Sequence, residues 1–190
     1  MISISRTLAM ASTLALLGCA GGNPLDTGTD AERAAALQTE CRSALNELYA
    51  EAPQARSIAE DSEGVLVFPN VVKAGLVIGG ESGNGCLIQN GEIVDYYNKS
   101  GGSFGFQAGA QSRSEVLMFM SDAALDKLEN RAGLEFGVDA SAAVVEVGAG
   151  GAIDTTNINS DILAFIFGEA GLMAAATLEG SKVTKLDWTS

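Results

Sequence analysis

The sequence contains no histidine, and this absence limits the chemistry available to the protein. Histidine is the side chain most often used as a general base near neutral pH, and it is also the commonest metal ligand. Proline is scarce too, at three residues against 23 glycines, which is not the composition of a Pro/Gly-rich disordered chain. We therefore expect a folded, non-catalytic protein with no metal site and no cofactor.

Basic residues are also few, with 11 Lys and Arg against 24 Asp and Glu and a formal net charge of −13. This balance opposes the counterion release on which sequence-independent binding to nucleic acid depends, so no nucleic-acid partner is expected. It also disfavours broad attraction to anionic lipid headgroups. Membrane association would therefore need an anchor or a local cationic patch.

The apolar run near the N-terminus is too short to span a bilayer. Thr7 to Gly18 carries no charge, but as a helix it would extend only about 18 Å, against roughly 30 Å for the hydrocarbon core. A short segment with one positive charge, Arg6, precedes it. This arrangement is typical of an export signal, and we predict a signal peptide over residues 1–18.

The segment Leu16-Leu17-Gly18-Cys19 resembles the lipobox of bacterial lipoproteins, in which the cysteine is acylated and becomes the new N-terminus. Two or three acyl chains give stable membrane anchoring. The alternative is that Cys19 is an ordinary thiol beside a signal-peptidase site. Ala20 follows the cysteine, and the sorting rules of such lipoproteins then predict a place in the cell envelope, at the outer membrane facing the periplasm. Residues 19–29 are expected to form a flexible tether, and residues 30–190 a single domain.

Two amphipathic helices, and a shorter one between them, are predicted from the sequence. The first runs from Asp30 to Glu51, with Thr29 or Asp30 as its N-cap and Pro53 marking its end. A shorter helix is expected over residues 54–61. The second amphipathic helix, residues 123–130, follows the capping pair Ser121-Asp122.

The rest of the domain has the pattern of short strands. Asn90-Gly91 between two apolar runs is the strongest local signal for a hairpin. Glycine clusters at 79–85 and 101–105 are interpreted as turns, with 79–85 exposed, and Pro69 as the end of a strand. Strands are predicted at 65–68, 74–80, 85–89, 92–97, 103–110, 115–120, 134–138, 142–148, 162–167, 172–178 and 182–187. The fold class is α+β: an N-terminal amphipathic helix packed on a curved, mainly antiparallel sheet or partly closed barrel, with a second short helix.

Cys41 and Cys86 form an even pair in a chain expected to be exported. A disulfide between them would link the first helix to the sheet. Two buried free thiols, acting as small apolar side chains, are the alternative.

Gly101-Gly102-Ser103-Phe104-Gly105 satisfies the G-x-S-x-G pattern of hydrolase nucleophile elbows. That elbow requires a strand before it, a helix after it and a histidine base. A turn leading into a strand is the better interpretation, and a serine hydrolase at Ser103 is the least favoured of the functions considered.

Several runs in order along the chain are similar to motifs of the SYLF domain family: residues 64–75, 79–85, 102–111, 164–168, 171–173 and 178–182. The resemblance covers about residues 53–187. It implies a lipid-binding or actin-binding type of domain, and for bacterial members a secreted or lipid-anchored protein. Lys73 and Lys182 match lysines of these motifs and are the candidate residues for an anionic phospholipid. The alternative function is a structural lipoprotein that contacts another envelope protein through loops at 79–85 and 149–160.

Overall fold

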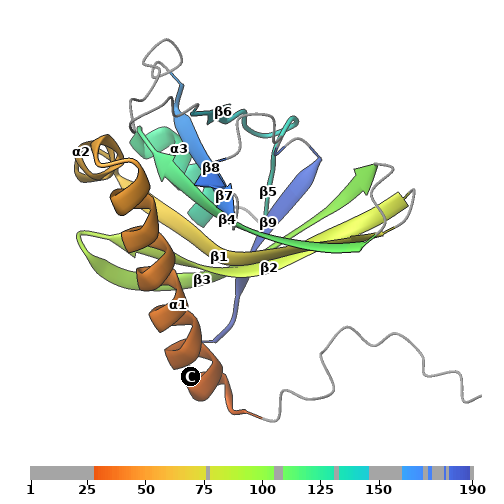
Figure 1. Cartoon of the computed structure of the whole chain (residues 1–190). Helices are drawn as coiled ribbons and strands as arrows, with labels where there is room; N and C mark the ends of the chain where they lie inside the picture. Colours follow the sequence, from red (N-terminus) through yellow and green to blue (C-terminus); the bar gives the residue numbers. More distant parts are fainter. Residues whose placement is uncertain are drawn as a thin grey trace, which may run out of the picture.

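The computed structural model describes residues 28–75, 78–104, 109–130, 133–145, 160–168, 171–172, 178 and 180–188. In these parts of the chain three helices accompany one mixed sheet of nine strands, which curls into an open half-barrel (Figure 1). The predicted α+β class is confirmed. The helices are α1 (Asp30–Glu51), α2 (Gln54–Glu60) and α3 (Asp122–Glu129), and the strands are β1 (Gly64–Gly75), β2 (Ile78–Gln89), β3 (Glu92–Phe104), β4 (Gly109–Phe119), β5 (Leu134–Glu135), β6 (Ala143–Val144), β7 (Ile162–Gly168), β8 (Gly171–Leu172) and β9 (Ser181–Leu186).

The strand order is β5-β9-β3-β2-β1-β4-β7-β6, with β8 paired to β7. Every pairing between named strands is antiparallel except that of β6 with β7. The predicted Asn90-Gly91 hairpin joins β2 to β3, with both residues at positive φ (52° and 80°), as a tight hairpin turn requires. The antiparallel pairing of β2 with β3 therefore follows from local turn chemistry.

Two predictions about where strands end were wrong. Pro69 does not end a strand, because β1 continues through it to Gly75 with a register shift against β4 between Phe68 and Val71. A bulge of this kind tolerates proline, since one residue there is left out of the ladder. The cluster 79–85 is not a turn either, because it pairs with β1 and β3 inside β2. Residues 101–104 likewise lie in β3.

The sheet has two apolar faces, which alternate along each strand as side chains of a pleated strand must. One face carries α1 and is called the helix face; its buried members include Val65, Val67, Cys86, Ile88, Val116, Met118, Leu163, Phe165 and Phe167. The other is called the inner face; it includes Leu66, Phe68, Val71, Leu87, Tyr97, Leu117, Phe119, Ile162, Ala164, Ile166 and Val183. The segment linking the two sheet ends, β5 and β6, contributes Phe136 to the inner cluster, so the sheet curls around this face.

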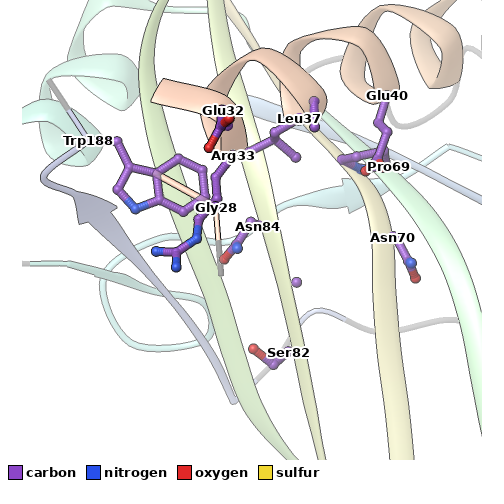
Figure 2. Close-up of a pocket in the computed structure, with 12 residues that line it drawn as sticks. Gly28, Glu32, Arg33, Leu37, Glu40, Pro69, Asn70, Ser82, Asn84 and Trp188 are labelled. Carbon is purple, nitrogen blue, oxygen red and sulfur yellow. The ribbon is translucent and has the colours of Figure 1, made fainter. Parts of the chain in front are cut away.

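Helix α1 begins with a capping box, in which the Thr29 side chain accepts from the Glu32 backbone and Glu32 reaches back to the Thr29 backbone. The hydrogen bonds from Thr29 also lower the pKa of Glu32. The N-terminal turns of α1 leave a groove between the helix and the strands beneath it (Figure 2). This groove lies on the helix face.

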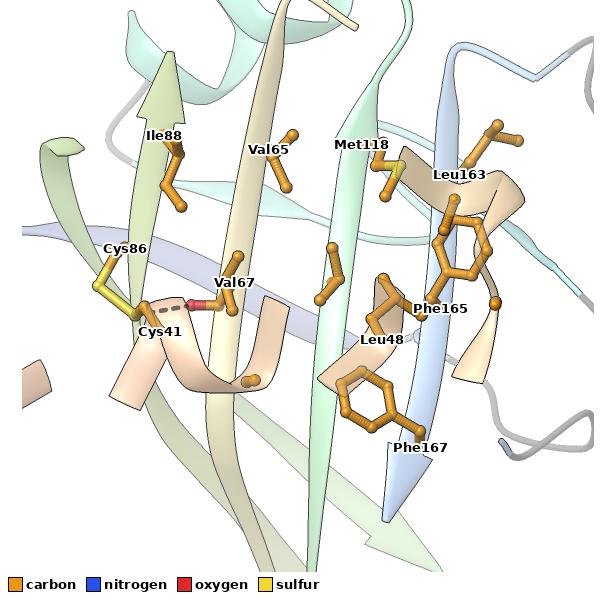
Figure 3. Packing of buried hydrophobic residues seen from close by; sticks show 14 of the residues in the cluster. Cys41, Leu48, Val65, Val67, Cys86, Ile88, Met118, Leu163, Phe165 and Phe167 are labelled. Atoms are coloured by element: carbon orange, nitrogen blue, oxygen red, sulfur yellow. Dashed lines mark hydrogen bonds between the residues drawn. A yellow bond between two sulfur atoms is a disulfide. The ribbon is translucent and has the colours of Figure 1, made fainter. Parts of the chain in front are cut away.

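Further along α1, a row of side chains packs on the helix face. Leu37, Cys41, Ala44 and Leu48 are buried, at spacings of three and four residues. Cys41 is joined to Cys86 of β2 by a disulfide bond (Figure 3). Of the two alternatives considered for these cysteines, the structure has the bonded one, and it ties α1 to the centre of the sheet.

Helix α3 covers one end of the inner face. Ser121 caps it by accepting from the Ala124 backbone at 3.3 Å, and Ala124, Leu125 and Leu128 are buried in the inner cluster. The charged residues of the inner face, Glu81, Lys99, Arg113 and Glu115, lie on strands β2, β3 and β4 beyond the part that α3 covers.

Candidate functional site

Four charged side chains form a closed ring on the inner face, which we call the charge ring: Glu81 of β2, Lys99 of β3, and Arg113 and Glu115 of β4. Lys99 Nζ lies 3.2 Å from Glu81 and also pairs with Glu115, and both Lys99 and Glu115 are fully buried. Arg113 completes the ring with contacts of 2.8 Å to each of the two carboxylates. Each cation thus contacts both anions, which suits the guanidinium fork of arginine.

The strand pattern explains why the ring lies on the inner face. Arg113 and Glu115 alternate with residues of the helix face and are in phase with Leu117 and Phe119. Lys99 follows Tyr97 by two residues, and its register partner on β2 is Gly83. Because Gly83 has no side chain, the stem of Lys99 can cross β2 toward β4.

The ring lowers the pKa of Glu81 and raises the pKa of Arg113. Burial alone would raise the pKa of Glu81, but Lys99 and Arg113 outweigh burial and hold this pKa below its ordinary value. Burial would lower the pKa of Arg113, but the charges and hydrogen bonds of Glu115 and Glu81 raise it. Glu81 and Arg113 are therefore expected to be charged at neutral pH.

Lys73 lies next to the ring. It is opposite Glu81 in the β1–β2 register and opposite Gln111 in the β1–β4 register, while Arg113 is its diagonal neighbour on the same face. The side chain of Lys73 is half-buried, and in the part of the chain that the structure describes it makes no ion pair or hydrogen bond. Both carboxylate oxygens of the facing Glu81 are already bonded, one to Lys99 and one to Arg113.

Counting Lys73 with the ring gives three cations, Lys73, Lys99 and Arg113, against two carboxylates, Glu81 and Glu115. This part of the inner face therefore carries an excess of one positive charge in a chain whose formal charge is −13. Arg113, at 13% side-chain exposure, is the ring member nearest to solvent. A local cationic patch of this kind is what an acidic chain needs to meet an anion.

The second candidate, Lys182, lies elsewhere. It is exposed on β9, opposite Ser100 of β3 and Glu135 of β5. Its neighbour Val183 points into the inner cluster, so Lys182 is on the other side of the sheet from Lys73. The structure therefore does not bring the two lysines into one site.

Of the remaining predicted positions, some lie in the described part of the chain and others lie outside it. Ser103 lies in β3, opposite Gly79 of β2, and the next element along the chain is strand β4, so the strand–turn–helix arrangement of a nucleophile elbow is not found there. The proposed contact loop at 79–85 is part of β2, and that interpretation was wrong. The signal peptide, Cys19 and most of the tether lie outside the described residues, as does all of 149–160 except residue 160.

Within the described ranges, no group of three His, Cys, Asp or Glu side chains could hold a metal ion. None of the helices described is both long enough and apolar enough to cross a bilayer.

The charge ring was not predicted from the sequence, although one signal was present. The alternating pattern that predicts one buried face for this strand puts two apolar residues, Leu117 and Phe119, on that face. The same alternation puts Arg113 and Glu115 there as well. Lys99 gave no comparable signal, because its partners lie on two other strands, β2 and β4.

The fold and the ring define the class of protein: an α+β half-barrel with a charged inner face. Residues 100–188 match the model of the Ysc84 family, described as Las17-binding protein actin regulator. This match, from within β3 to just beyond β9, is to the SYLF (Ysc84) domain family that the motifs predicted. The match includes Arg113, Glu115 and Lys182, whereas Lys73 and Glu81 precede it. No curated protein matches the chain.

Proposed function

We propose that this protein is a non-catalytic lipoprotein of the bacterial cell envelope, held at the outer membrane by acylation of Cys19, whose SYLF domain binds anionic phospholipid. The observation that carries the lipid-binding proposal is Lys73, a half-buried lysine without a partner in the described parts of the chain, beside Arg113. The family match supports the proposal at the level of the domain. The family's printed description refers to actin regulation, and for an exported chain a lipid is the better-suited partner.

The anchor and the headgroup site have separate roles. The acyl chains on Cys19 would supply membrane affinity that a chain of net charge −13 lacks. Lys73 and Arg113 would then select among headgroups, because a phosphate accepts hydrogen bonds from ammonium and guanidinium groups. Within the charge ring, the carboxylates of Glu81 and Glu115 hold Arg113 in place.

Vesicle flotation tests the headgroup site. The chain starting at Ala20, which keeps every described residue and cannot be acylated, is mixed at low salt with phosphatidylcholine vesicles with or without phosphatidylglycerol. We expect flotation with the anionic vesicles alone. Lys73→Gln should weaken it several-fold, whereas Lys182→Gln, a lysine on the opposite face, should leave it unchanged. No flotation at low salt, or equal flotation of Lys73→Gln and the unaltered chain, would contradict the proposal.

Metabolic labelling tests the anchor independently. Cells expressing the full chain with radiolabelled palmitate should yield a labelled protein in the outer-membrane fraction. Cys19→Ser should carry no label and should leave that fraction. A Cys19→Ser protein that partitions as the unaltered one does would show that the anchor proposal is wrong.

A further inference from the structure

The groove beneath the N-terminal turns of α1 lies on the helix face, on the other side of the sheet from Lys73 and the charge ring (Figure 2). It is an open groove of about 490 Å³ between α1, strands β1 and β2, and Trp188 near the end of the described chain. A second hollow of about 320 Å³ shares Glu40, Pro69 and Asn70 with it. Small-molecule sites usually enclose roughly 300–1,000 Å³. Together the two hollows have room for an elongated ligand.

The charges at the end of the groove near the start of α1 are already engaged. The Glu32 carboxylate accepts from the Thr29 backbone at 2.8 Å and from its hydroxyl at 3.1 Å. Arg33 pairs with Asp30 at 3.1 Å. Glu40 adds one exposed carboxylate further along the helix. An anionic ligand would be repelled by these carboxylates, and Arg33, the cation that lines the groove, is already paired with Asp30. A neutral ligand therefore fits the groove better.

The polar groups on the sheet side are neutral, and two of them are amides whose oxygens are hydrogen-bonded. Asn84 Oδ1 accepts from Asn98 Nδ2 at 2.8 Å, and Asn70 Oδ1 accepts from Ser112 Oγ at 2.6 Å. Each contact engages the oxygen of an amide and leaves its NH₂ group as a donor. The β1 bulge that follows Phe68 brings Asn70 to this face. The groove therefore offers two amide donors, with the Glu40 carboxylate as an acceptor.

An aromatic ring, Trp188, stands at the same end of the groove as Glu32 and Arg33. Figure 2 shows Trp188 across from Asn70 and Glu40, with Asn84 between them. The indole contacts the Tyr96 ring, with centroids 5.6 Å apart, and Gln38 donates to the Tyr96 hydroxyl. Trp188 is thus supported from behind by a ring that is itself held in place.

We propose that this groove binds a neutral oligosaccharide. A pyranose ring has C–H faces that pack on an aromatic ring, and a rim of hydroxyls that both accept and donate hydrogen bonds. Trp188, the amides of Asn70 and Asn84, and the Glu40 carboxylate match these two kinds of surface. The site lies beyond the lipid-binding proposal and does not depend on it, because no residue is shared with Lys73 or the charge ring.

Intrinsic fluorescence tests the proposal directly, because Trp188 is the one tryptophan in the sequence. The full chain, in a detergent without a sugar headgroup, is titrated with cellobiose, maltose and N,N′-diacetylchitobiose to about 10 mM, a range that covers weak binding. We expect at least one disaccharide to change the emission saturably. Inositol hexakisphosphate, an anion, should not compete.

Variants link the signal to the groove. Asn70→Ala and Asn84→Ala should each weaken binding about tenfold or more, while Glu51→Gln, at the far end of α1, should leave it unchanged. Two asparagine variants are included so that misfolding of one, seen in its circular dichroism, still leaves the other as a test. The proposal is overturned if no disaccharide gives either an emission change or a calorimetric signal, or if binding survives in the folded asparagine variants.

Discussion

Lys99 of β3 and Glu115 of β4 form a fully buried ion pair although β2 and β1 lie between their strands. Gly83 of β2, the register partner of Lys99, has no side chain on the inner face between the lysine and β4. Burying two charges is costly unless both are well bonded. Here Glu81 and Arg113 supply the additional bonds.

Removing Lys99 alone should strongly destabilise the protein. Lys99→Met leaves two buried carboxylates with Arg113 as their remaining cation, and breaking such a buried pair costs about 3–5 kcal/mol. Urea unfolding of the chain starting at Ala20 measures this loss. Lys185→Met is the matched control, because Lys185 pairs with Asp95 at 2.7 Å near the surface, where a pair contributes about 1 kcal/mol or less. Equal losses for the two variants would show that the ring has no special role in stability.

The same ring predicts how stability depends on pH. The folded-state pKa of Glu81 is held below its ordinary value, so its contribution to the free energy of unfolding is present above the unfolded-state pKa, about 4.3, and is lost as the pH falls through the folded-state pKa. Glu81→Gln should therefore be less stable than the unaltered protein at pH 7, and the gap should narrow as the pH falls below about 4. Denaturant unfolding over this pH series is the measurement. A gap that stays constant down to about pH 3 would contradict the assignment.

The disulfide between Cys41 and Cys86 should contribute measurably to stability. It closes a loop with a sequence separation of 45 residues, for which the chain-entropy relation gives about 4 kcal/mol. The double variant Cys41→Ser, Cys86→Ser should show this loss in urea unfolding, and reduction of the unaltered protein should give a similar one. If unfolding is unchanged by reductant, the bond does not form in solution.

Gly85 should not tolerate even a methyl group. A Cβ at this position would lie 2.5 Å from Phe68 Cδ1 and 2.5 Å from the Val67 carbonyl oxygen, so the packing of β1 against β2 would have to shift. Gly85→Ala is expected to cost about 1–3 kcal/mol. Gly102→Ala is the control, because Gly102 is also in a strand but nothing lies within 4 Å of its added Cβ. Thermal unfolding that shifts equally for both variants would contradict the expected clash.

Local patterns predicted the helices and the turn at Asn90-Gly91 well. Thr29, Pro53 and Ser121 mark helix ends through their own backbone or side-chain chemistry, which does not depend on distant residues. The turn predicted from the glycines at 79–85 was wrong because a local pattern does not show what a neighbouring strand requires. Glycine is typical of turns, but in β2 it allows close approach: a Cβ at Gly83 would lie 2.7 Å from the Asn70 carbonyl oxygen. That requirement comes from the neighbouring strand and is not visible in the segment itself.

The candidate site was predictable in part. Lys73 was identified from the family motif, but its separation from Lys182 depends on which face of the sheet each residue occupies. The charge ring depends on pairing across four strands, and long-range register of that kind is not encoded in local periodicity. The disulfide was left open because cysteine spacing alone cannot determine pairing.

Nuclear magnetic resonance of the lysine side chains tests the lipid-binding proposal most directly. The chain starting at Ala20, with its lysines labelled with ¹⁵N and ¹³C, is titrated with a short-chain phosphatidylglycerol below its critical micelle concentration. The Lys73 side-chain signals, assigned by their loss in Lys73→Gln, should shift saturably, while those of Lys182 stay in place and short-chain phosphatidylcholine has no effect. Lys73 signals that do not move, or that move equally with both lipids, would contradict the account.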